Sequence, residues 1–195
     1  MALDAQEWAR QDAIQSARRW LVLGASGGGK STFAVELGRI LDLPVVHLDR
    51  HYWRPGWVEP PSEEWDRQLL ALTQDDEWVM DGNYSRTLSH RLPRANVAVL
   101  LDFSTLVCLW GVVQRSIIHR GRGRPDMAPG CPERLPDRAF LRWVLSYKRR
   151  SRPRVLGLLE GASHVHFVRL RNRNDARHFL ATLEEQRRRT GLTPG

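Results

Sequence analysis

The sequence has 195 residues, 42% hydrophobic and 27% charged, which is typical of one folded domain rather than a disordered or fibrous chain. It contains no apolar run of the roughly 18 residues that a membrane-spanning helix needs, and its first residues include acids and lack the apolar centre of a signal peptide. Its two cysteines, Cys108 and Cys131, cannot build a disulfide framework and show no zinc-binding spacing. We therefore expect a single cytoplasmic domain over residues 1–195, without a membrane partner.

The net charge of +8 is concentrated in one part of the chain. Residues 114–154 contain twelve Arg or Lys and three acidic residues, whereas the rest of the chain contains 18 basic and 19 acidic residues. An excess confined to one segment indicates a surface that binds a concentrated anion. The alternative is a solvated face rich in arginine, because the chain has 28 Arg and only two Lys. That bias does not explain why acids are scarce in this segment alone.

Short apolar runs alternate with helical patterns along the chain. The apolar runs predict strands at residues 20–23, 44–48, 78–80, 97–101 and 164–170. Helical spacing predicts helices at residues 33–41, 62–73, 104–119, 136–148, 153–159 and 175–189, with Ser62 and Ser104 as N-caps. Residues 1–17 predict one more amphipathic helix, and Trp65, Trp110 and Trp143 are predicted core residues. Strands that alternate with helices indicate an α/β fold, a five-stranded parallel sheet flanked by helices.

The segment between the first strand and the first long helix carries the strongest chemical signal. Residues 24–31 read Gly-Ala-Ser-Gly-Gly-Gly-Lys-Ser, a match to the P-loop pattern GxxxxGK[ST] between a strand and a helix. Glycines let backbone N–H groups surround phosphate oxygens, while Lys30 reaches the β- and γ-phosphates and Ser31 binds Mg²⁺. A flexible Gly/Ser turn is the alternative, but one of the two lysines stands at the required position. The predicted ATP-binding residues are Gly24, Ala25, Ser26, Gly27, Gly28, Gly29, Lys30, Ser31 and Thr32.

Two carboxylates are candidates for a second contact with the metal. Asp81 and Asp102 each follow a predicted strand, so on a parallel sheet both lie at the edge that bears the P-loop. Asp81 is favoured because Gly82 leaves room for a ligand, whereas Asp102 can instead serve as a structural cap near the helix that begins at Ser104. The sequence therefore predicts that Ser31 and Asp81 hold Mg²⁺.

Several motifs after the P-loop resemble those of a known family. Asp81-Gly82 followed by Arg86 is similar to the DG(F/Y)PR segment of adenylate kinases, with one additional residue before the arginine. More distinctive motifs are His47-Leu48-Asp49 with Tyr52-Trp53 and Trp57, Asp81-Gly82-Asn83-Tyr84, and Arg124-Pro125-Asp126-Met127 with Gly130-Cys131-Pro132-Glu133. Over residues 20–180 the chain resembles the adenylate kinase-like P-loop proteins known as DNA topology modulation proteins. The resemblance implies a P-loop NTPase fold of the nucleotide kinase type, and it leaves the substrate open.

Asp49 follows the second predicted strand, at the edge where kinases of this type receive the phosphoryl acceptor. A carboxylate there can orient an acceptor hydroxyl and accept its proton, whereas a phosphate acceptor would need it only for positioning. A structural salt bridge to Arg50 or Arg54 is the alternative. Tyr52 and Trp53 begin an aromatic run that can wall an acceptor pocket or pin a loop to the core. The predicted substrate-binding residues are Asp49, Tyr52, Trp53, Asp81 and Arg86.

The basic segment provides a candidate lid over the phosphates. Phosphoryl transfer concentrates negative charge between donor and acceptor, so arginines that close over it are expected. Residues 115–154 are predicted to form an Arg-rich lid inserted between the fourth and fifth strands, with Arg120 and Arg124 favoured over Arg149 and Arg150. The predicted catalytic residues are Lys30, Asp49, Arg120 and Arg124.

Two functions from different classes follow from these features. The first is an ATP-dependent kinase that moves the γ-phosphoryl group to a small acceptor, such as a nucleoside, a nucleotide or an alcohol. The second is a nucleotide-gated ATPase that binds nucleic acid, with the lid arginines on the phosphodiester backbone. Asp49 and its aromatic neighbours favour the kinase, because a backbone binder does not need them. The basic segment serves either function.

Overall fold

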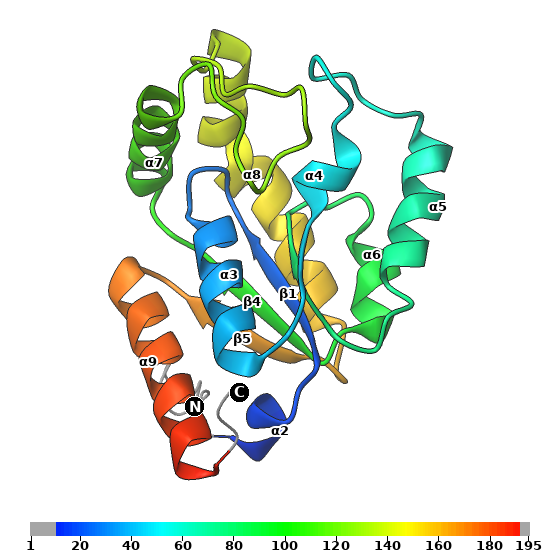
Figure 1. The fold of residues 1–195 in the computed structure, drawn as a ribbon, viewed down its shortest axis with the longest axis vertical. Helices are drawn as coiled ribbons and strands as arrows, with labels where there is room; N and C mark the ends of the chain where they lie inside the picture. The colour runs from blue at the N-terminus through cyan, green and yellow to red at the C-terminus, as the bar shows by residue number, and fades with distance from the viewer. Residues whose placement is uncertain (1–10, 192–195) are drawn as a thin grey trace.

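The computed structural model describes residues 11–191, in which five strands form one parallel sheet (Figure 1). The strands are β1 (Arg19–Gly24), β2 (Val45–His47), β3 (Trp78–Asp81), β4 (Val97–Leu101) and β5 (His166–Leu170). Their order is β2-β3-β1-β4-β5, so β1, the strand that leads into the P-loop, lies in the centre of the sheet. The predicted α/β fold with a five-stranded parallel sheet is confirmed.

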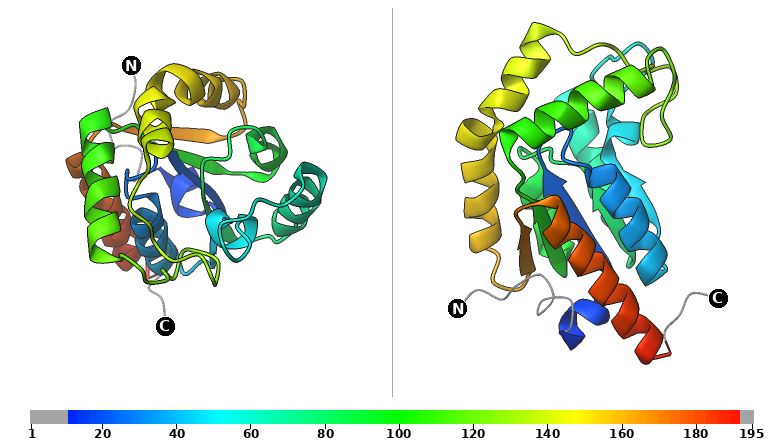
Figure 2. Two further views of the ribbon diagram at one scale, coloured as in Figure 1. Left: turned by 90° about the horizontal axis from the view of Figure 1, so that it is seen from above. Right: turned by 90° about the vertical axis from the view of Figure 1, so that its left-hand side faces the viewer.

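Helices cover both faces of this sheet (Figure 2). They are α2 (Asp12–Gln15), α3 (Lys30–Leu41), α4 (Leu48–Tyr52), α5 (Ser62–Leu72), α6 (Leu88–Arg91), α7 (Thr105–Ile118), α8 (Arg138–Glu160) and α9 (Arg173–Arg189), with one 3₁₀ helix at Leu92–Arg94. Of the helix predicted over residues 1–17, the part at 1–10 lies outside the described residues, and α2 is one short turn with Ile14 buried. No helix in the described range is long and apolar enough to cross a membrane.

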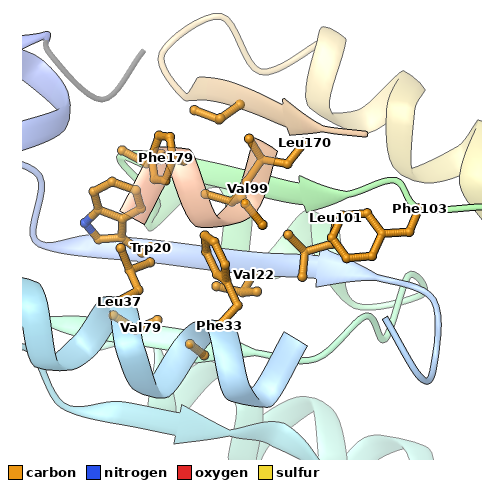
Figure 3. Close-up of a cluster of buried hydrophobic side chains, with 14 of the residues drawn as sticks. Trp20, Val22, Phe33, Leu37, Val79, Val99, Leu101, Phe103, Leu170 and Phe179 are labelled. Atoms are coloured by element: carbon orange, nitrogen blue, oxygen red, sulfur yellow. The ribbon is translucent and has the colours of Figure 1, made fainter. Parts of the chain in front are cut away.

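The two faces of the sheet bury separate apolar cores. Neighbouring residues of a strand point to opposite faces, so Trp20 packs with α3 and α9 while Leu21 packs with α5 and α6. Figure 3 shows the first core, in which Trp20 and Phe33 both contact Phe179. Burying one such aromatic side chain contributes about 1.5–3 kcal/mol. These cores hold the strands so that their carboxyl ends meet at one edge.

The sequence predicts two helices at residues 136–148 and 153–159, and the structure shows one. Helix α8 continues through Pro153, which is exposed, as is Arg149, the residue whose carbonyl oxygen loses its helical partner. Its first half buries Val144 against one core and its second half buries Val155 against the other. Packing at both ends outweighs the local cost of the proline, which sequence rules treat as a helix boundary.

Two further predictions about helices need correction. Ser62 is the first residue of α5 rather than its N-cap, which is Pro61, whereas Ser104 caps α7 as predicted. Trp65 is buried, but Trp110 and Trp143 are 62% and 46% exposed. Helix α7 is apolar on all sides, so its sequence pattern has no polar face to reveal which side is buried.

Candidate functional site

The P-loop joins β1 to α3 in a conformation that its glycines permit. Gly27 and Gly29 have φ angles of 77° and 81°, and Gly29 is the N-cap of α3. Side chains rarely adopt this left-handed region, so glycine is required there. The Lys30 ammonium group donates a hydrogen bond to the carbonyl oxygen of Ala25 at 3.2 Å, which places it over the loop. The loop therefore has the shape that surrounds phosphate oxygens with backbone N–H groups.

Gly111 of α7 sets the distance between this helix and the P-loop. A Cβ atom at position 111 would lie 2.1 Å from the carbonyl oxygen of Gly27, and one at Gly27 would lie 2.0 Å from that of Cys108. Both contacts are between backbones, so neither can be relieved by turning a side chain. Gly111 is not among the residues predicted from the sequence, although a glycine inside an apolar helix is a known signal of close packing.

Asp81 lies at the end of β3, in register with His47 of β2 and Val22 of β1. It is 5% exposed, and its Oδ2 atom lies 3.0 Å from Nδ1 of His47. Its Oδ1 atom is buried and has no hydrogen-bond partner within the described structure. A buried carboxylate oxygen without a partner suits the water shell of a nucleotide-bound Mg²⁺, which needs only one or two protein carboxylates. The chemistry of Asp81 is therefore compatible with the predicted metal, and Ser31, the other predicted ligand, lies in the first turn of α3.

Asp102, the competing carboxylate, has a structural role. Arg152 donates to both of its oxygens at 2.8 and 2.9 Å, and Arg169 donates to Oδ2 at 2.9 and 2.6 Å. Burial opposes ionisation, but these arginines outweigh it and hold the pKa of Asp102 below its usual value. Because its oxygens are fully engaged, Asp102 ties α8 and β5 to the end of β4.

Asp49 is in the first turn of α4 and accepts a hydrogen bond from the Tyr84 hydroxyl at 2.7 Å on Oδ1. Burial raises its pKa, although the Tyr84 bond and the Lys30 charge act in the opposite direction. Among the described residues Asp49 forms no salt bridge with Arg50 or Arg54, the two alternatives; Arg50 is exposed, and Arg54 pairs with Glu64. Asp49 is thus a carboxylate with one oriented oxygen and one available oxygen.

Arg91 supports the site from behind, and no local sequence pattern marks it. Its buried guanidinium group donates to the carbonyl oxygens of Gly82 and Asn83 at 2.9 and 2.7 Å, and to that of Tyr84 at 3.3 Å. Burial lowers its pKa to about 9. Tyr84 has a positive φ of 29°, which is rare for a non-glycine residue. Arg91 therefore holds the segment that aims Tyr84 at Asp49.

The aromatic run after Asp49 is both a wall and an anchor. Tyr52 packs against Trp53, Trp65 and Tyr84 with ring centroids 4.8–5.1 Å apart. Trp57 contacts Trp53, and its indole N–H donates to the carbonyl of Pro132 at 3.1 Å. A backbone hydrogen bond of 2.9 Å from position 56 to position 130 adds to this connection. The run therefore joins α4 to the loop that follows α7.

The predicted lid, residues 115–154, comprises the last turn of α7, the loop 119–137 and most of α8. Within it, Arg124 is nearly buried between Asp126 and Glu133, at 3.0 and 2.8 Å. Arg115, another arginine of the predicted lid, also pairs with Glu133, at 3.1 Å. Because Glu133 and Asp126 hold the two guanidinium groups, the loop has a defined shape.

Many of the predicted site residues line one cavity of about 630 Å³. Of the predicted site residues, its wall includes Gly24, Ser26, Lys30, Asp49, Tyr52, Trp53, Arg86 and Arg124. The predicted residues that are not part of this wall are Ala25, Gly27, Gly28, Gly29, Ser31, Thr32, Asp81 and Arg120. Arg120 is exposed, and Arg86 is paired with Asp66 by hydrogen bonds of 3.0 and 2.7 Å. The cavity connects the P-loop lysine with Asp49 and the aromatic wall.

Comparison with solved structures identifies the fold. A shikimate kinase from Acinetobacter baumannii in complex with shikimate has a TM-score of 0.56 and 15% identity over 92% of this chain and 98% of its own. A gluconokinase from Sinorhizobium meliloti 1021 has a TM-score of 0.47 and 15% identity over 91% and 98% of the two chains. A deoxyadenosine kinase from M. mycoides with bound dCTP has a TM-score of 0.42 and 10% identity over 89% and 99%. No protein-family model matches the sequence, and no curated protein matches it significantly. The chain has the fold of the P-loop kinases.

Proposed function

We propose that the protein is an ATP-dependent phosphotransferase that moves the γ-phosphoryl group of ATP to a hydroxyl group of a small acceptor. The observation that carries this proposal is the shared cavity, in which Lys30 of the P-loop and Asp49 line one space of about 630 Å³. A donor site next to a positioned carboxylate is the arrangement that phosphoryl transfer to an alcohol requires. As part of the same proposal, residues 1–195 form one cytoplasmic domain of the adenylate kinase-like group that includes the DNA topology modulation proteins.

The P-loop holds the donor in this proposal. Backbone N–H groups of residues 24–32 bind the phosphate oxygens at the start of α3, and Lys30 contacts the β- and γ-phosphates. Ser31 and Asp81 would hold Mg²⁺, which when bound offsets phosphate charge. The unpartnered Oδ1 of Asp81 supports this assignment.

Asp49 acts on the acceptor. The acceptor hydroxyl oxygen forms a bond to the γ-phosphorus, the bond from that phosphorus to the bridging oxygen of ADP breaks, and the hydroxyl proton passes to Oδ2 of Asp49. Tyr84 holds Oδ1, so the carboxylate cannot turn away from the acceptor. The raised pKa of Asp49 improves it as a proton acceptor.

Arginines of the lid stabilise the charge that develops during transfer. Arg124 lines the cavity, and its described contacts with Asp126 and Glu133 use Nη1 and Nε, which leaves Nη2 for a phosphoryl oxygen. Fixed donors of this kind contribute about 10²–10³-fold in rate. Arg120 is proposed to reach the phosphates only if the loop closes further, because it is exposed and outside the cavity wall.

A screen for ADP formation with nucleosides, nucleotides and small alcohols tests this function. Asp49→Asn keeps the shape of the side chain but removes the base, so turnover should fall about 10²–10⁴-fold while ATP affinity stays nearly unchanged. Asp75→Asn is the matched control, since Asp75 is exposed and is not part of the cavity wall. Loss of ATP binding in Asp49→Asn would show that the donor and acceptor sites are assigned wrongly.

The second candidate, a nucleotide-gated ATPase that binds nucleic acid, is favoured by one observation. The solvent-facing side of α8 exposes basic residues away from the cavity wall, namely Arg138, Arg142, Lys148, Arg149, Arg150 and Arg154. Such a surface would bind phosphodiester backbones with a steep dependence on salt. Under the kinase proposal this binding is weak and independent of sequence, and DNA does not stimulate turnover.

A further inference from the structure

The part of the cavity beside Asp49 has an unusual charge distribution. We call the cavity-lining residues around the proposed base the acceptor wall, namely Asp49, Tyr52, Trp53, Trp57, Glu59, Tyr84 and Arg86. Two of its side chains that face the cavity are carboxylates, Asp49 and Glu59. Asp49 accepts a hydrogen bond from Tyr84, and Glu59 interacts with the Tyr52 hydroxyl. Within the described structure, neither carboxylate forms a salt bridge.

Arg86, the basic residue of the acceptor wall, is already engaged, and Arg50 and Arg54 beside it are not part of the cavity wall. Arg86 is held by Asp66 through two hydrogen bonds, and Arg91 is fully buried on backbone carbonyls. Lys30 and Arg124 are assigned to the phosphoryl group in transfer. Arg134, another basic residue of the cavity, stands in the loop before α8 rather than in the acceptor wall. Recognition of a phosphate or carboxylate depends on an available guanidinium fork, which this wall does not offer.

An anionic acceptor would also impair Asp49. A negative group on the acceptor would share the cavity with Asp49, which is half-buried, and with Glu59, which is exposed. Like charges repel more strongly at the half-buried Asp49 than at the solvated Glu59. Proximity of that group would disfavour the ionised carboxylate that the reaction needs as a base. Both effects lower turnover with an acceptor that already bears a phosphate group.

The remaining surface of the acceptor wall is aromatic. Tyr52, Trp53, Trp57 and Tyr84 line the cavity, and they hold one another at centroid distances of 4.8–5.4 Å. Aromatic surfaces of this kind bind planar or apolar rings through stacking and edge contacts. The acceptor wall therefore has aromatic surfaces that can bind a ring, a carboxylate that can accept a proton, and a second carboxylate that adds negative charge.

We infer that the acceptor is a ring-bearing alcohol without a phosphate or carboxylate group, the chemistry of a nucleoside rather than of a nucleotide. This inference rests on the proposed kinase function and narrows its substrate class. Glu59 is the specificity-determining residue, because it adds negative charge to the acceptor wall without contacting the transferred group.

The test measures kcat/KM for matched acceptor pairs with Mg²⁺-ATP as donor: nucleosides against their 5′-monophosphates, and ring alcohols against their phosphates or carboxylates. For the wild type we expect kcat/KM of the uncharged member to exceed that of the anionic member by at least about tenfold. Glu59→Gln, which preserves size and the Tyr52 contact, should reduce this ratio several-fold. Glu63→Gln on α5 is the control, since Glu63 is exposed and outside the cavity wall, and it should leave the ratio unchanged.

The possible failures are distinguishable. A wild-type preference for the anionic members would overturn the inference and leave the kinase proposal intact, because ADP formation would still depend on acceptor and on Asp49. An unchanged ratio in Glu59→Gln would overturn the role of Glu59. Absence of acceptor-dependent ADP formation with every pair would instead contradict the proposed kinase function.

Discussion

The contact between Gly111 and the P-loop offers a sharp structural test. In Gly111→Ala the new methyl group would lie 2.1 Å from the carbonyl oxygen of Gly27, whereas ordinary contacts begin near 3.4 Å. The P-loop or α7 must therefore move by about 1 Å, as expected for overpacking against a backbone, which typically costs about 1–3 kcal/mol. Alanine also gains about 1 kcal/mol over glycine inside a helix. The apo protein should thus lose at most about 2 kcal/mol of stability.

The larger effect of Gly111→Ala should be on nucleotide binding. At an ATP concentration 100 times the wild-type Kd, binding stabilises the native state by about 2.7 kcal/mol, and a tenfold weaker Kd reduces this to about 1.4 kcal/mol. Thermal unfolding with and without Mg²⁺-ATP measures both quantities, because each kcal/mol corresponds to about 2–4 °C in Tm for a chain of this size. We expect a clearly reduced ATP-induced shift in the variant.

Gly157→Ala provides the matched control for this experiment. Gly157 also lies inside a helix, but a Cβ atom there would meet no atom within 4 Å apart from the backbone of its own helix. The variant should gain up to about 1 kcal/mol from helix propensity and keep the full ATP-induced shift. If Gly111→Ala behaved like Gly157→Ala in both respects, the proposed role of the close approach between α7 and the P-loop would be refuted.

Further predictions concern the charged groups of the site. Lys30→Ala should abolish the ATP-induced rise in Tm without unfolding the apo protein; an unchanged rise would disprove the P-loop assignment. Asp81→Asn should weaken nucleotide binding in the presence of Mg²⁺ and have little effect when the metal is chelated, which titrations under both conditions would show. Arg124→Ala should lower turnover about 10²–10³-fold and more than Arg120→Ala, and equal effects would argue against the cavity as the catalytic centre. The pKa of Asp102 is depressed, so its stabilisation is present above the unfolded pKa of about 3.9 and is lost as pH falls through the folded value. Asp102→Asn should therefore cost about 2 kcal/mol at pH 7, and the difference from wild type should shrink under acid conditions in urea unfolding experiments.

Features that depend on neighbouring residues were accessible from the sequence. Four strands were recognisable as short apolar runs and β5 by its alternating pattern, and the P-loop was recognisable because its glycines and Lys30 stand at fixed spacing. Parallel strands end at one edge, so the placement of Asp49 and Asp81 near the P-loop followed from the order of elements. These inferences need no information about distant side chains.

Features that depend on distant partners were not accessible. Nothing local marks Arg91, whose role comes from carbonyl groups brought to it by β3. The pairing of Arg124 with Glu133 forms only when the loop 119–137 folds back on itself. Counting the charged residues of the lid therefore overestimated how many of its arginines are free of an acidic partner. Tertiary packing likewise determines which side of α7 is buried. It also stabilises α8 as one continuous helix that includes Pro153. In each case the structure is determined by contacts between residues that are distant in the sequence, and local propensity does not reveal these contacts.

The fate of the γ-phosphorus tests the central proposal most directly. Phosphorus-31 NMR of a reaction with Mg²⁺-ATP and a panel of uncharged ring alcohols distinguishes a phosphate ester from inorganic phosphate. The kinase proposal predicts that the γ-phosphoryl signal is replaced by that of a new ester, together with ADP, and that Asp49→Asn suppresses this conversion. Formation of inorganic phosphate alone, accelerated by added DNA and unaffected by Asp49→Asn, would contradict it.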